Sequence, residues 1–148
     1  MRDRTVPILV YDTILVSTDG SASATRAVTH ALELGELSGA ELHAVYVVDT
    51  TRFAEPALSS SEIATNDVEA WGQQELDEVA DRANALGLDA VVRCCHGKPH
   101  VEIVEYADQI DADVIVLGYQ GHTHADSDQL GSVTDRVVDS AGRPVLIA

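Results

Sequence analysis

Two short segments of the chain carry residue types that could hold a phosphorylated ligand. They are Ser17–Ser21 (STDGS) and a glycine-rich stretch in which Gly118–Gly121 (GYQG) is followed, after nine residues, by Gly131–Thr134 (GSVT). Glycine lets the main chain approach a ligand closely and reach positive φ. A helix N-terminus presents unpaired N–H groups and a positive dipole end, which suit a phosphate. If Gly131–Thr134 opens a helix, it forms an anion cradle without lysine, with Ser132 and Thr134 as hydroxyl donors.

The elements that position these segments follow from the hydrophobic pattern. Continuous apolar runs predict five strands, at Thr13–Thr18, Glu41–Val48, Leu88–Cys95, Val114–Leu117 and Pro144–Ala148. Apolar residues at helical spacing predict four helices, at Ala22–Ser38, Ser61–Leu86, Pro99–Ile110 and Gly131–Ala141. In the second helix we expect the buried stripe to consist of Val68, Trp71, Leu76, Val79, Ala83 and Leu86.

The alternation of strands and helices predicts a single α/β domain over residues 1–148. Continuous apolar strands between amphipathic helices are typical of a parallel sheet that is covered on both faces. We expect a doubly wound, Rossmann-like sheet of five strands in the order 3-2-1-4-5. Ligands bind such sheets where the strand order reverses, beyond the carboxyl ends of the strands. This rule brings together the loops that follow Thr18 and Leu117.

The strongly acidic charge of the chain limits the functions that it can have. Twenty-five acidic residues face nine basic ones, for a formal net charge of −16, and Lys98 is the only lysine. Nucleic-acid binding is disfavoured, because phosphate backbones attract clustered Lys and Arg. A chain with this charge repels itself in dilute buffer, but molar salt shortens the Debye length to roughly 3 Å and removes most of that repulsion. The charge therefore favours an origin in a cytoplasm that accumulates salt. No apolar run approaches the roughly 20 residues of a membrane span, and no signal peptide is recognised, so we expect a cytoplasmic protein.

The spacing Gly118-x2-Gly121-x9-Gly131-Ser132, together with Asp19 after the first strand, resembles the nucleotide-binding pattern of the universal stress protein family, in its ATP-binding branch. The resemblance runs from Tyr11–Val16 (YDTILV) to Arg143–Ile147 (RPVLI) and includes a turn at Gly97-Lys98-Pro99. It implies the adenine nucleotide alpha hydrolase-like fold, and a regulatory or stress-response module that binds ATP.

The resemblance also implies a role for each matching residue. Asp19 would meet the ribose or a phosphate-bound metal, and Mg²⁺ would bridge phosphate oxygens. Ser17 and Thr18 would line the adenine pocket through main-chain atoms, and Val47 would pack on the adenine. Leu117 and Gly118 would border the ribose and phosphates. The phosphates themselves would be cradled by Gly121, Gly131, Ser132, Val133 and Thr134.

Other interpretations of these residues stay open. Asp19 and Ser132 could serve only as helix caps, Gly118 and Gly121 could only shape a turn, and Val47 could be core. The insert from residue 122 to residue 130 (HTHADSDQL) holds two acids and no Lys or Arg, which opposes a triphosphate. AMP or ADP are therefore alternatives to ATP, and a nucleotide-free interaction module is a rival of another class.

No catalytic set is recognised in the sequence. There is no GxSxG elbow, HExxH pair or GxxxxGK[ST] loop, so the chain is at most a slow ATPase. His122 and His124 are expected to be solvated, and the adjacent Cys94 and Cys95 fit neither a disulfide framework nor a zinc pattern. The short last strand would form an open sheet edge, and the resemblance implies a homodimer through that C-terminal strand.

Overall fold

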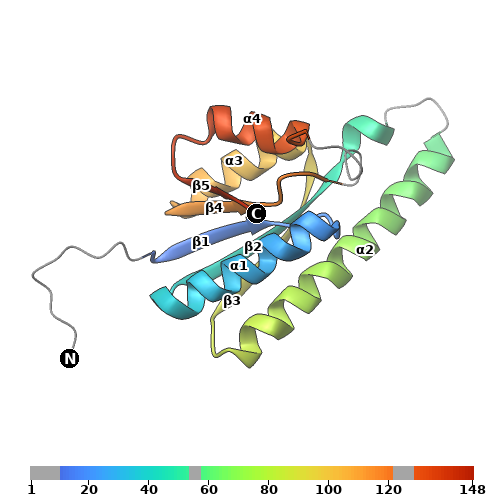
Figure 1. Ribbon diagram of the computed structural model, residues 1–148. Coiled ribbons are helices and arrows are strands. Elements are labelled where there is room, and N and C mark those ends of the chain that lie inside the picture. Colours follow the sequence, from blue (N-terminus) through green and yellow to red (C-terminus); the bar gives the residue numbers. More distant parts are fainter. Residues whose placement is uncertain (1–10, 54–57, 122–128) are drawn as a thin grey trace, which may run out of the picture.

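The computed structural model describes residues 11–53, 58–121 and 129–148. Within them a five-stranded parallel sheet lies between two layers of helices (Figure 1). The strands are β1 (Thr13–Ser17), β2 (Glu41–Asp49), β3 (Ala90–Gly97), β4 (Val114–Leu117) and β5 (Val145–Ile147). The helices are α1 (Ala22–Ser38), α2 (Leu58–Ala85), α3 (Pro99–Ile110) and α4 (Ser132–Ser140), with a 3-10 turn η1 (Thr50–Phe53) after β2.

The strand order is β3-β2-β1-β4-β5, which confirms the predicted topology. β1 pairs with both β2 and β4, so the order reverses at the centre of the sheet. The predicted bounds differ from the observed ones by at most three residues, at the start of α2, where residue 61 was expected and residue 58 is found. The carboxyl ends of β1 and β4 therefore lie side by side, as the ligand-binding rule requires.

Two hydrophobic cores cover the two faces of the sheet. Side chains alternate along a strand, and on β2 Ala44 and Val48 face the core shared with α1 and α2. The intervening Val45 faces the core shared with α3 and α4, and Val47 packs against its edge. Figure 1 shows α1 and α2 on one side of the sheet and α3 and α4 on the other.

Local signals set where α1 and α3 begin and end. The Ser21 hydroxyl caps α1 by accepting a hydrogen bond from the Ala24 N–H (3.2 Å), as serine commonly does at this position. Gly39 ends α1 in the left-handed conformation at φ 67°. Pro99 stands in the first turn of α3, where its missing N–H removes no helical hydrogen bond.

The prediction for the buried face of α2 is wrong in two places. Trp71 and Leu86 are 60% and 42% exposed, whereas Leu76, Val79 and Ala83 are buried as expected. The buried face of α2 is rotated from the predicted one because Gly72 faces the Tyr46 ring, where a Cβ would lie only 2.4 Å from the ring. The Tyr46 ring thus packs directly on the α2 main chain, and Trp71 points outward.

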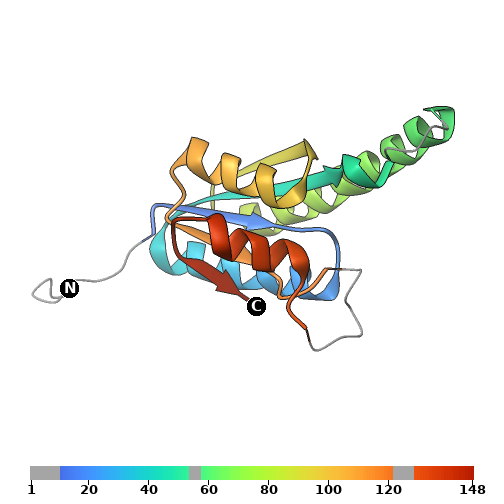
Figure 2. The same cartoon turned by 90° about the horizontal axis from the view of Figure 1, so that it is seen from above.

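The view from above shows the N-terminal half of α2 projecting past the end of the sheet (Figure 2). Within the described ranges, no helix has both the length and the apolar character that a membrane crossing needs.

Candidate functional site

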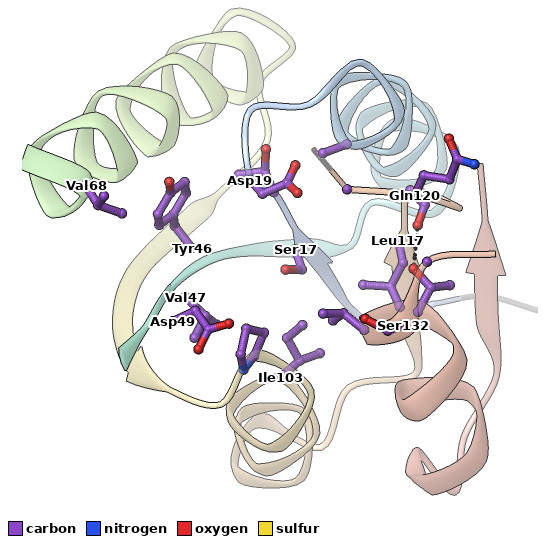
Figure 3. A pocket seen from close by; sticks show the side chains of 18 residues that line it. Ser17, Asp19, Tyr46, Val47, Asp49, Val68, Ile103, Leu117, Gln120 and Ser132 are labelled. Carbon is purple, nitrogen blue, oxygen red and sulfur yellow. Dashed lines mark hydrogen bonds between the residues drawn. The ribbon is translucent and has the colours of Figure 1, made fainter. Parts of the chain in front are cut away.

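A cleft of about 220 Å³ opens where the carboxyl ends of β1, β2 and β4 meet (Figure 3). It is lined from both sheet faces, by α1 and α2 on one side and by α3 and α4 on the other. The structure brings all of the sequence-predicted site residues into its lining: Ser17, Thr18, Asp19, Val47, Leu117, Gly118, Gly121, Gly131, Ser132, Val133 and Thr134. The two segments that are about 100 residues apart in the chain therefore form one cavity.

The tip of β1 is a tight turn fixed by its own side chains. The Thr18 N–H donates to the Val45 carbonyl (3.0 Å), which extends the pairing of β1 with β2. The Asp19 Oδ1 accepts from the Ser21 N–H (2.9 Å), so the carboxylate is held at the cleft (Figure 3). Ser21, not Asp19, is the N-cap of α1. The interpretation of Asp19 as a helix cap is therefore wrong, and its turn leaves it facing the cavity.

The three glycines of the second segment allow close approach of the main chain. A Cβ on Gly118 would lie 2.6 Å from the Ser23 carbonyl carbon, and one on Gly121 would lie 2.7 Å from the Asp19 Oδ2. A Cβ on Gly131 would lie 3.2 Å from the Gln120 Cα. None of the three has a positive φ. Packing against main-chain atoms therefore demands glycine at Gly118, whereas a Cβ on Gly121 would meet only the end of the Asp19 side chain and one on Gly131 would be in tight contact.

The first turn of α4 supplies main-chain donors at the cleft. Gly131 is its N-cap, at φ −63° and ψ 149°, and no side chain within the described residues caps the helix. The Ser132 side chain is exposed. The Thr134 hydroxyl donates to the Gly118 carbonyl (2.7 Å), so it is not the phosphate donor that the sequence suggested. The contribution of this turn is its amides and the positive end of its dipole.

The opposite wall of the cleft is apolar. Val47 was expected there, and Tyr46, Val68, Pro99 and Ile103 also line the cleft. Leu117, which was expected to border the ribose and phosphates, lies beside Ser132 (Figure 3). Figure 3 places Val47 near Ile103, and Tyr46 between Val68 and the tip of β1. From the sequence, Tyr46 was placed in a strand and Val68 in the buried stripe of α2, and Pro99 and Ile103 were placed in the helix that follows β3. Pro99 was the available signal, since it sets the start of α3 directly after the end of β3.

Two polar lining residues were also missed. Asp49 lies at the end of β2, where its Oδ1 accepts from the Thr51 N–H (3.0 Å). Gln120 is buried, and its Nε2 donates to the Gln129 carbonyl (2.8 Å) across the insert. Neither residue stood out in the sequence by its type or spacing. Among the described residues that line the cleft, none is Lys, Arg or His.

The histidines and cysteines that attracted attention in the sequence do not join this cleft. His122 and His124 lie outside the described residues. Cys94 and Cys95 lie on β3 and face opposite cores. Burial is the main cause that raises the pKa of each thiol. In the part of the chain that the structure describes, no three His, Cys, Asp or Glu residues gather as a metal site.

A further perturbed group lies under α3. Burial raises the pKa of Tyr106, and the nearby Arg93 guanidinium opposes that rise. The Tyr106 hydroxyl lies 2.8 Å from the Nδ1 of buried His43, whose Nε2 lies 2.6 Å from a Glu41 carboxylate oxygen. None of these four residues lines the cleft. The cluster satisfies polar groups at the opposite end of β2 and adds nothing to the site.

Comparisons with known proteins agree with this geometry. The universal stress protein family (Usp) matches residues 10–148. A universal stress protein of Methanocaldococcus jannaschii is 37% identical over 139 residues, which cover 93% of this chain and 82% of that relative. The solved structure of the universal stress protein UspA from Lactobacillus plantarum is 29% identical with a TM-score of 0.88, over 95% of this chain and 99% of that one. A crystal structure of a universal stress protein in complex with cAMP is 31% identical with a TM-score of 0.67, over 95% and 98% of the two chains. The chain therefore belongs to the universal stress protein family.

Proposed function

We propose that the cleft binds an adenine nucleotide, ATP with Mg²⁺, and that its occupancy is the signal of a stress-response module. The observation that carries this proposal is the division of one cavity into two chemically different halves. One half is apolar, with Val47 and Ile103, and the other offers main-chain amides at the start of α4. A flat base and a phosphate chain need these two environments at opposite ends of one ligand.

The proposed pose follows from these halves. The base lies against Val47 and Ile103, beside the main chain of Ser17 and Thr18. The ribose passes between Asp19 and Leu117, and the phosphates extend from Gly118 to the first turn of α4. A relative that is 31% identical was crystallised in complex with cAMP, which supports an adenine ligand in this cleft.

The donor set fits a magnesium ion only if the nucleotide supplies part of its coordination. Asp19 places one carboxylate at the cleft, and no cluster of three ligating side chains occurs among the described residues. Mg²⁺ commonly keeps several waters and binds one or two carboxylates together with substrate phosphates. We therefore assign Asp19 as the protein group nearest the ion, which would neutralise phosphate charge when bound.

Calorimetric titration with Mg-ATP in molar KCl tests the proposal. We expect saturable binding to the wild-type protein and its loss in Gly131→Val, because the added side chain meets Gln120 and the Tyr119 carbonyl. Ala85→Val adds similar bulk at the exposed end of α2 and should bind like wild type. Circular dichroism must show that all three proteins are folded. No heat from the wild type, or unchanged binding by Gly131→Val, would overturn the proposal.

A rival function is an interaction module that does not bind nucleotide. It is favoured by one observation, the lack of a cationic side chain among the described lining residues. Adenine nucleotide that is released on denaturing the freshly purified protein would reject it, whereas nucleotide-free protein that also fails to titrate would support it.

We also propose a homodimer through β5. This strand pairs with β4 on one side, and its Leu146 and Ile147 are 38% and 39% exposed. Pairing of two β5 strands across a two-fold axis would cover the edge and these side chains. Light scattering in molar KCl should give twice the mass of one chain, and a monomer mass would contradict the assignment.

A further inference from the structure

The side chain of Gln120 joins the two parts of the glycine segment. Gln120 follows β4, lines the cleft and is 5% exposed. Its Nε2 donates to the carbonyl of Gln129 (2.8 Å), nine residues later in the sequence. Close by, the Gly131 N–H donates to the Tyr119 carbonyl (2.7 Å). The end of β4 is therefore tied by one side-chain contact and one main-chain contact to the residues that lead into α4.

The residues that lead into α4 are held by such contacts rather than by burial. Gln129 is exposed, and Leu130 is 40% exposed. The N-cap Gly131 is extended, with a ψ of 149°, so the direction in which the helix begins follows from where Gln129 and Leu130 lie. The Gln120 side chain fixes a point two residues ahead of the N-cap, and we expect it to limit the tilt of the first turn.

This tilt matters because hydrogen bonds depend on direction. The N–H···O angle prefers values above about 150°, and the bond weakens steeply below about 120°. The first-turn amides of α4 are the donors to the phosphates in the proposed pose, so their strength depends on how the turn is held. The base end of the cleft is built by Val47 on β2 and Ile103 on α3, which do not depend on this contact.

We infer that Gln120 is a positioning residue for the phosphates, and that its contact with Gln129 sets the preference of the cleft for a phosphorylated ligand over the free nucleoside. The inference rests on the proposed nucleotide-binding function and adds a residue that determines specificity within it. Gln120 acts through the α4 amides and need not touch the ligand. A residue that only stabilised the fold would affect nucleoside and nucleotide alike.

Calorimetric titration of Gln120→Met in molar KCl tests the inference. Methionine has a similar shape but no N–H to donate, and water can replace the lost donor because Gln129 is exposed. We expect the Kd of Mg-ATP to rise about tenfold, the scale of one weakened hydrogen bond to a charged group. The Kd of adenosine, which has no phosphate, should stay within about twofold of wild type, because effects at independent sites couple little.

A matched variant controls for the exchange of glutamine by methionine. Gln74→Met makes the same change at an exposed position of α2 that does not line the cleft, and should bind both ligands like wild type. Circular dichroism and retained adenosine binding show that Gln120→Met is folded.

The two ligands separate the ways in which the inference can fail. If folded Gln120→Met binds Mg-ATP within about twofold of wild type, Gln120 does not position the phosphates, and the nucleotide-binding proposal stands without it. If both ligands weaken equally, Gln120 supports the whole cleft, which also overturns the inference. If the wild-type protein binds neither ligand, the proposed function itself is rejected, and the inference with it.

Discussion

The N-termini of α1 and α4 both border the cleft, and the chain finishes them in different ways. The Ser21 hydroxyl accepts from the Ala24 N–H, so α1 satisfies one of its first-turn amides with its own side chain. At the start of α4 stands Gly131, which has no side chain, and within the described residues nothing else caps the helix. The N-terminus of α1 is therefore capped by a side chain of the chain itself, whereas the first-turn amides and positive dipole end of α4 are presented to the cleft.

The two helices also differ in how they meet β4. The first turn of α1 packs directly on the end of β4, because Gly118 has no Cβ to separate it from Ser23 and Ala24. The first turn of α4 is held by a hydrogen bond from the Thr134 hydroxyl to the Gly118 carbonyl. We interpret α1 as a fixed support of the glycine segment and α4 as the element that contacts the ligand.

The largest effect expected from this comparison is the loss of stability in Gly118→Ala. The new methyl group would lie 2.6 Å from the Ser23 carbonyl carbon and 2.7 Å from the Ala24 nitrogen, and these main-chain atoms cannot rotate away. We expect the free energy of unfolding to fall by about 3 kcal/mol, as measured by denaturant titration in molar KCl. A loss of less than about 0.5 kcal/mol, typical of a neutral surface site, would mean that α1 is not fixed on β4.

The second prediction compares the loss of a first-turn amide in α4 with the same loss in α1. Ser132→Pro removes one amide from the first turn of α4, where proline fits the helix and Gly131 already has a suitable ψ of 149°. Loss of a hydrogen bond to a charged phosphate should weaken Mg-ATP binding about tenfold or more. Ala22→Pro is the matched control, because it removes the equivalent amide of α1 after Ser21, whose ψ is 165°.

We expect Ala22→Pro to bind Mg-ATP within about twofold of wild type, since surface changes of this kind are close to neutral. Calorimetry measures both variants. If both weaken binding equally, the distinction between the two helices fails.

The smallest effect concerns the cap itself. Ser21→Ala deletes the hydroxyl that accepts from the Ala24 N–H, and should lower the free energy of unfolding by about 1 kcal/mol. Ser132→Ala should leave the free energy of unfolding within about 0.5 kcal/mol, because the exposed Ser132 side chain caps nothing among the described residues. Thermal or denaturant unfolding distinguishes the two, and the reverse ranking would refute the assignment of Ser21 as the structural cap.

The features of the molecule that sequence could predict are those with a strong local signal. Continuous apolar strands such as VIVL at Val114–Leu117 and the stop at Gly39 defined the elements, and the reversal rule then placed the loops after β1 and β4 together. Glycine spacing alone identified Gly118, Gly121 and Gly131 as lining residues.

What sequence could not predict depends on contacts between distant segments. The contact of Gly72 with the Tyr46 ring rotates α2 and exposes Trp71, and no periodicity within α2 reveals it. The spacing suggests the Thr134 hydroxyl as a phosphate donor, but in the structure it donates to the Gly118 carbonyl. Asp49, the last residue of β2, and Gln120, which follows β4, line the cleft without a signal in residue type or spacing.

Nitrogen–proton correlation spectroscopy during titration with Mg-ATP in molar KCl shows directly which main-chain amides hold the phosphates. Phosphate binding by the first turn of α4 predicts large, saturable shifts at Ser132, Val133 and Thr134, with small shifts at Ala22 and Ser23. Shifts concentrated at the α1 amides, or α4 amides that stay unchanged while the nucleotide binds, would contradict it.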